Sequence, residues 1–105
     1  MAKIKHPPQI GNLMAMIQER IDQGAYRLTL HALDRQDERE IDLPDVLYVL
    51  KNGYHERAKN SFDDAFKTWK YAVRGKTVEL IEIRIIVAFD ENEMLIITVM
   101  HVAKG

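Results

Sequence analysis

The sequence predicts an α+β fold in which N-terminal helices pack on one face of a three- or four-stranded antiparallel sheet. Two observations carry this prediction. Apolar residues recur at helical spacing up to residue 52, and β-branched and aromatic residues fill three runs after Gly53. A chain of 105 residues can close one core but hardly two. We therefore expect a single domain over residues 1–105, with residues 1–25 as a helical extension and residues 26–105 as the core.

Three helices are expected in the first half of the chain. A stripe of apolar residues at three- and four-residue spacing predicts the first helix over residues 10–21. An extended segment over residues 26–29 then leads into a second helix over about residues 30–40. The third helix begins at residue 42 or 43, carries Pro44 in its first turn and ends at residue 52 or 53.

An antiparallel meander is expected in the second half. Its three strands are the runs over residues 68–74, 78–89 and 94–102, which are rich in β-branched and aromatic side chains. Residues 54–60 are a candidate edge strand, and residues 61–66 fit either a loop or a single helical turn.

Turn geometry assigns the faces of the last two strands. A two-residue and a four-residue loop agree in placing Phe89 opposite Met94. The same register puts Glu82 across from His101, with Arg84 on the same face. This face lies opposite the apolar one that receives the helices.

The turn at residues 75–77 is open to two interpretations. A three-residue turn sends Trp69 and Tyr71 to the core face and puts Lys70 and Arg74 on the opposite face, whereas a two-residue turn inverts this arrangement. We prefer the longer turn because it buries the two aromatic rings.

Charge is segregated along the chain, although the net charge is only −1. Residues 19–48 hold eight acids and four bases, a balance of −4, whereas residues 51–76 hold seven bases and three acids, a balance of +4. A local basic field can attract a polyanion, but a charge run is also typical of an ordinary solvated surface.

Several function classes lack support in the sequence. The chain has no cysteine, no apolar run of membrane-spanning length and no apolar segment of a secretory signal near its start, so we expect a cytoplasmic protein without disulfides. The four histidines show no metal-ligand spacing, and glycine-rich nucleotide motifs are missing. We expect neither a metal nor a cofactor.

Two groups of residues are candidates for chemistry. The first is the predicted charged face, where a solvent-exposed sheet with Glu82 paired to Arg84 or His101 is the structural alternative. The second is a stripe at four-residue steps on the second helix, whose alternative is local pairing with neighbouring acids. The members of the stripe are His31, Arg35 and Arg39.

The second helix and the last strands carry a signature. It reads H-A-x-x-R-x-x-E-R over residues 31–39, followed by an apolar helix ending in N-G and a late strand ending in I-T-V. In these features residues 27–100 resemble a family of small bacterial proteins, and the layout is similar to that of the RelE-like toxin superfamily, which includes BrnT. The resemblance implies a RelE-like fold and metal-independent cleavage of messenger RNA on the open sheet face. It also implies an antitoxin as protein partner.

Cleavage of RNA by its own 2′-hydroxyl needs a base, an acid and cations at the phosphate. His101 and Glu82 are the acid–base candidates, and Arg84, Lys70 and Arg74 are the groups expected to hold the phosphate.

The helix stripe allows two roles. His31 would complete the catalytic set, and Arg35 and Arg39 would bind RNA, or the stripe would instead hold the rim of the sheet. RNA and the ribosome are further expected partners. The sequence does not decide between a monomer and a homo-oligomer. The alternative function is a non-catalytic RelE-like regulatory or protein-interaction module.

Overall fold

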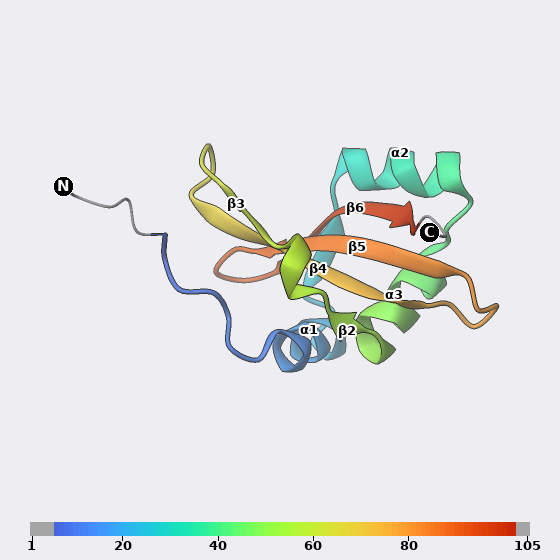
Figure 1. Ribbon diagram of the computed structural model, residues 1–105, viewed down its shortest axis with the longest axis horizontal. Helices are drawn as coiled ribbons and strands as arrows, with labels where there is room; N and C mark the ends of the chain where they lie inside the picture. Colours follow the sequence, from blue (N-terminus) through green and yellow to red (C-terminus); the bar gives the residue numbers. More distant parts are fainter. Residues whose placement is uncertain (1–5, 103–105) are drawn as a thin grey trace.

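The computed structural model describes residues 6–102, which form an α+β fold (Figure 1). The elements in chain order are α1 (Leu13–Asp22), β1 (Tyr26–Leu28), α2 (Leu30–Arg39), α3 (Leu43–Asn52), β2 (Tyr54–His55), the 3-10 turn η1 (Arg57–Lys59), β3 (Ser61–Asp63), β4 (Thr68–Lys76), β5 (Glu82–Phe89) and β6 (Met94–His101). None of the helices in this part of the chain is long and apolar enough to cross a membrane.

The three predicted helices are confirmed, and local signals explain their ends. The side chain of Asn12 caps α1, and that of Thr29 caps α2 by accepting a hydrogen bond from the N–H of Ala32. Glu40 ends α2 in the left-handed conformation, with φ of 54°. Pro44 lies in the first turn of α3, where its missing N–H leaves no helical bond unmade.

The sheet is larger and more mixed than expected. Within the described residues it has six strands in the order β1-β6-β5-β4-β2, with β3 also paired to β4. β1 runs parallel to β6, so the expectation of three or four purely antiparallel strands is wrong. β1 lies in the expected extended segment over residues 26–29, and β2 begins the candidate edge strand over residues 54–60. β3 lies where a loop or a helical turn was expected, so that expectation is wrong, and its three residues are too few to show a pattern of alternation.

The central strands keep the predicted faces even though one turn differs. β4 continues to Lys76 and β5 begins at Glu82, so residues 77–81 form a longer turn than the one expected at residues 75–77. Val73 pairs with Ile85 and Arg74 with Arg84. The register therefore moves by an even number of residues, which leaves every side chain of β4 on its expected face.

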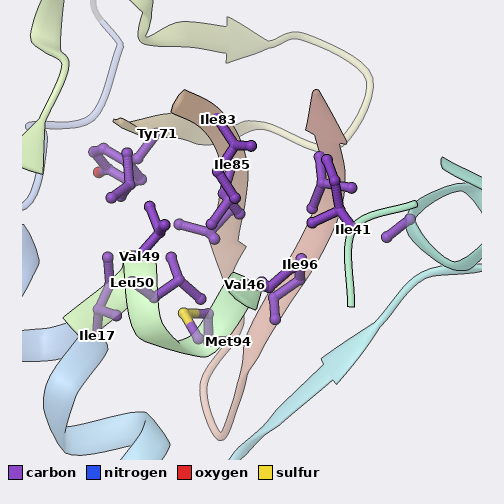
Figure 2. Packing of buried hydrophobic residues seen from close by; sticks show 14 of the residues in the cluster. Ile17, Ile41, Val46, Val49, Leu50, Tyr71, Ile83, Ile85, Met94 and Ile96 are labelled. Carbon is purple, nitrogen blue, oxygen red and sulfur yellow. The ribbon is translucent and has the colours of Figure 1, made fainter. Parts of the chain in front are cut away.

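The core lies between this sheet and the helices α1 and α3 (Figure 2). Val46, Val49 and Leu50 of α3 pack against the apolar face of the strands, and Ile17 of α1 belongs to the same cluster. The proposed N-terminal extension thus contributes to the single core. α2 instead lies beside β6 (Figure 1).

Two glycines allow the end of α3 to touch β4. A Cβ atom added at Gly53 would lie 2.5 Å from the carbonyl oxygen of Arg74, and one added at Gly75 would lie 2.9 Å from Cα of Gly53. Because both neighbours are backbone, neither contact can be relieved by a side-chain rotation. This close approach fixes α3 against the strand that carries Arg74.

We expect Gly53→Ala to lower the free energy of unfolding by about 1–3 kcal/mol, because the new methyl group must push the two backbones apart. Gly11→Ala is the matched control, since a Cβ there would meet nothing within 4 Å, and its effect should stay within about 0.5 kcal/mol. Urea unfolding of both variants measures the difference. Equal stabilities would show that α3 does not need this contact.

Candidate nucleic-acid interface

The face of the sheet opposite the core carries a cluster of four charged side chains, hereafter the charged cluster. Arg74 and Arg84 are direct register partners on β4 and β5, and each follows or precedes a buried core residue along its strand. Their side chains therefore emerge side by side on the open face. The members of the cluster are Glu56, Arg74, Glu82 and Arg84.

Glu56 joins the two arginines. Its carboxylate accepts hydrogen bonds from Nε and Nη2 of Arg84, at 2.5 and 3.1 Å, and from Nη1 of Arg74 at 3.1 Å. Arg74 in turn donates through Nη2 and Nε to Glu82, with distances from 2.8 to 3.2 Å. The result is a continuous chain of charge-assisted bonds in which two positive charges balance two negative ones.

Glu56 lies on this face two residues after Tyr54, the register partner of Arg74, and the edge strand is interrupted directly after it. After β2 the chain leaves the ladder for the turn η1 and returns as β3. The N–H of Glu56 bonds to the carbonyl of Ala72, and Oδ1 of Asn60 accepts the N–H of the same residue. The side chain of Asn60 therefore takes the place of the backbone carbonyl that a regular strand would offer to the N–H of Ala72. The chain between Glu56 and Asn60 can then turn away without leaving that N–H unpaired.

The charged cluster is only partly accessible. The side chains of Glu56 and Arg84 are 12% and 16% exposed, and those of Arg74 and Glu82 are 28% and 29% exposed. The hydrogen bonds from Arg84 lower the pKa of Glu56 below its ordinary value, and those from Arg74 lower the pKa of Glu82. Both carboxylates are held in their ionised forms.

The structure brings together three of the predicted site residues and adds one. Glu82, Arg74 and Arg84 share the open face as expected. Lys70 lies on the same face of β4, and its Nζ is 3.9 Å from a carboxylate oxygen of Asp63. Glu56 could not be identified from the sequence, because β2 has only two residues and no pattern in the sequence sets its register against β4.

His101 does not belong to the charged cluster, and its predicted position across from Glu82 is wrong. Phe89 does pair with Met94, but a β-bulge at Ile97 shifts the register by one residue. His101 therefore pairs with Ile83, while Met100 pairs with Arg84.

The one-residue shift turns the histidine away from the arginines. The sulfur atom of Met100 lies 3.8 Å from Nη1 of Arg84 on the open face. The ring of His101 points to the other side, where its Nε2 lies 2.9 Å from the carbonyl oxygen of Arg39. His101 and Glu82 thus cannot act as an acid–base pair in this arrangement.

The stripe on α2 also stays away from the charged cluster. Arg39 donates to the carbonyl oxygen of Val99 at 2.5 Å, and the hydroxyl of Thr29 donates to that of Ile97 at 3.1 Å. These carbonyls lie along β6 beyond the three residues that pair with β1. α2 thus protects an otherwise open strand edge, and Arg39 holds the rim of the sheet through backbone rather than through the expected acids.

The other two members of the stripe lie at the surface. Arg35 pairs with Glu38 one turn away on the same helix, and His31 is exposed. Ala32, between them, is fully buried against the core. No group of three or more His, Asp or Glu side chains gathers at metal-binding distance anywhere in residues 6–102.

Most of the described chain matches the model of a protein family. The model of a family described as a domain of unknown function (DUF4258) matches residues 28–101. This segment includes α2, α3 and the whole sheet except the first two residues of β1, and it leaves out α1. No curated protein matches the chain.

Loss of the Glu56 carboxylate should change how stability depends on pH. Because its folded pKa is lowered, Glu56 stabilises the native state above its unfolded pKa of about 4.3, and this contribution is lost as pH falls through the folded pKa. We expect Glu56→Gln to be less stable than the wild type at pH 7 and to lose less stability on acidification to pH 3. Urea midpoints across this pH range test this expectation, with Glu19→Gln on the solvent-facing side of α1 as the matched loss of a carboxylate. Parallel curves for the wild type and Glu56→Gln would contradict it.

Removal of the Arg39 guanidinium should destabilise the fold through the edge of β6. Arg39→Met keeps the aliphatic stem but leaves the carbonyl of Val99 without this donor, at a cost of about 2 kcal/mol. Arg35→Met removes only an exposed pair with Glu38 and should cost less than about 0.5 kcal/mol. Chemical denaturation of both variants compares the two arginines, and similar losses would rule out the special role of Arg39.

Proposed function

The chain belongs to the DUF4258 family, whose description names no function, and we propose that it is a metal-independent endoribonuclease with its active site at the charged cluster. The observation that supports this proposal is the carboxylate of Glu56 held between two arginines on a sheet face that α1 and α3 leave open. A fixed carboxylate beside two guanidinium groups combines a proton acceptor with a site for a phosphate.

The proposed reaction is attack of a ribose 2′-oxygen on its own phosphate. Glu56 accepts the 2′-hydroxyl proton while the O2′–P bond forms, and Arg84 and Arg74 stabilise the charge on the non-bridging oxygens. The P–O5′ bond then breaks to give a 2′,3′-cyclic phosphate and a 5′-hydroxyl. Tyr54 is the candidate donor of the proton to O5′, since it pairs with Arg74 in register and its side chain is exposed.

Substrate binding requires an exchange of partners within the charged cluster. A phosphate takes over donors that now serve carboxylates, because the guanidinium fork binds both anions in the same bidentate way. Nη1 of Arg84 is well placed for this, since its partner is only the sulfur of Met100 at 3.8 Å. Glu82 keeps Arg74 oriented during the exchange through its separate pair of bonds.

The wider proposal follows from the resemblance of residues 27–100 to RelE-like toxins. In it the protein acts on messenger RNA in the cytoplasm, and an antitoxin neutralises it by covering the open face. Lys70, on that face of β4, adds positive charge to the RNA path. His31, Arg35, Arg39 and His101 lie away from the charged cluster and have no part in the proposed step.

A second candidate is a non-catalytic interaction module of the same fold. It is favoured by the internal balance of the charged cluster, whose two arginines already have carboxylate partners. In this case the cluster serves to hold β2, β4 and β5 together, and the open face binds a partner without chemistry.

Cleavage of a labelled single-stranded RNA in the presence of a chelator separates the two candidates. For the nuclease we expect cyclic-phosphate products from the wild type, and a loss of at least about 100-fold in rate for Glu56→Gln. The acidic limb of the rate profile should lie below about pH 4.3, because Arg84 lowers the pKa of Glu56. Glu19→Gln and His101→Ala should cleave like the wild type.

Circular dichroism and urea unfolding establish that Glu56→Gln is folded in the assay. Arg84→Lys is a second variant that keeps the charge but removes the fork, and it should also be slow. Absence of cleavage by the wild type, or full activity of Glu56→Gln, would overturn the nuclease. An acidic limb near pH 6.5 that disappears in His101→Ala would assign the chemistry to the histidine instead.

A further inference from the structure

A groove of about 920 Å³ on the open face is lined by residues of β4, β5 and β6 and of the turns at residues 64–67 and 90–93. These two turns lie at the same end of the sheet (Figure 1). The turn at residues 77–81 lies at the other end. The residues that line the groove come from both hairpins and from the junction of β1 with α2. They include Phe66, Lys70, Ala88, Asp90, Glu91, Leu95 and Ile97.

The floor of the groove is apolar. Ala88 of β5 and Leu95 and Ile97 of β6 line it. Ile97 is the unpaired residue of the β-bulge, and its side chain stays on the face where alternation from Leu95 places it. The aliphatic side chains of this floor can pack against the face of a planar ring.

An aromatic ring stands at the rim. Phe66 is 80% exposed at the tip of the β3–β4 hairpin. Its backbone is nevertheless fixed, since Oδ1 of Asp63 accepts the N–H groups of both Ala65 and Phe66. An exposed phenyl ring on a turn held in this way is a platform on which a base can stack without first ordering the loop.

Polar groups border the opposite rim. Oδ1 of Asp90 accepts the N–H groups of Asn92 and Glu93, but no hydrogen bond among the described residues engages its Oδ2 or the carboxylate of Glu91. Carboxylate oxygens accept hydrogen bonds from exocyclic amino groups of bases. Lys70 lies on the side of the groove toward Arg74, four residues away along β4, or about 13 Å.

From these features we infer that the groove binds a nucleobase of single-stranded RNA, stacked on Phe66 above the apolar floor. The inference rests on the proposed function for the identity of the polymer, which would run along the strands from the charged cluster to the groove. Asp90 and Glu91 favour bases that carry an amino group, which are adenine, cytosine and guanine rather than uracil.

Fluorescence anisotropy with labelled 2′-O-methyl RNA pentamers tests the inference without cleavage, because these oligonucleotides lack the attacking hydroxyl. We expect Phe66→Ala to weaken binding about tenfold and Phe66→Trp to retain it. Leu80→Ala is the matched control, since Leu80 is 75% exposed on the turn at the other end of the sheet. Oligo-U should bind most weakly, and the double variant Asp90→Asn, Glu91→Gln should reduce this discrimination.

The outcomes separate the groove from the nuclease. Binding that depends on Phe66 in a protein that never cleaves RNA would support the groove and overturn the nuclease. Cleavage by the wild type, together with unchanged binding by Phe66→Ala, would overturn the groove alone. If the wild type binds no pentamer, or if Leu80→Ala weakens binding as much as Phe66→Ala, the inference is wrong.

Discussion

The alternation of side chains along β4 and β5 is the constraint on which the rest of the structure depends. Val73 and Ile85 are buried against α3, and this commits their neighbours Arg74 and Arg84 to the open face as register partners. Two guanidinium groups side by side repel each other unless anions lie between them. The partly buried site of Glu56 and Glu82 follows from that requirement, so the packing of the core and the charge of the open face are consequences of one register.

The edge of the sheet becomes irregular directly after Glu56. Alternation from Tyr54 places the carboxylate of Glu56 on the open face, within reach of both arginines, and the chain then leaves the ladder through η1. Asn60 compensates for the missing strand residue, because its Oδ1 accepts the N–H of Ala72. On the opposite edge, the guanidinium of Arg39 donates a hydrogen bond to the carbonyl of Val99, which lies beyond the residues of β6 that pair with β1. Both edges of this small sheet are therefore completed by side chains where regular strands end.

Much of the fold could be predicted from the sequence, and the failures share a cause. The helices have strong local signals in Pro44, Thr29 and the apolar stripes, and the faces of β4 and β5 follow from parity, so that even an incorrect turn left Arg74 and Arg84 on the same face. β3 and the bulge have no such signal. In the run of β-branched residues 96–99 an extra residue leaves the pattern of apolar side chains almost unchanged, and the position of His101 could not be read from it.

The bulge has a chemical consequence beyond the misplaced histidine. Had β6 continued without it, Thr98 and Met100 would have faced the core, and Val99 and His101 the open face. With it, Val99 fills the core and the thioether of Met100 lies against Arg84, whereas Ile97 faces the groove in either case. The open face thereby loses an imidazole and gains the contact between Met100 and Arg84. Within the charged cluster the proton acceptors are then the carboxylates of Glu56 and Glu82, and Glu56 is the one that both arginines contact.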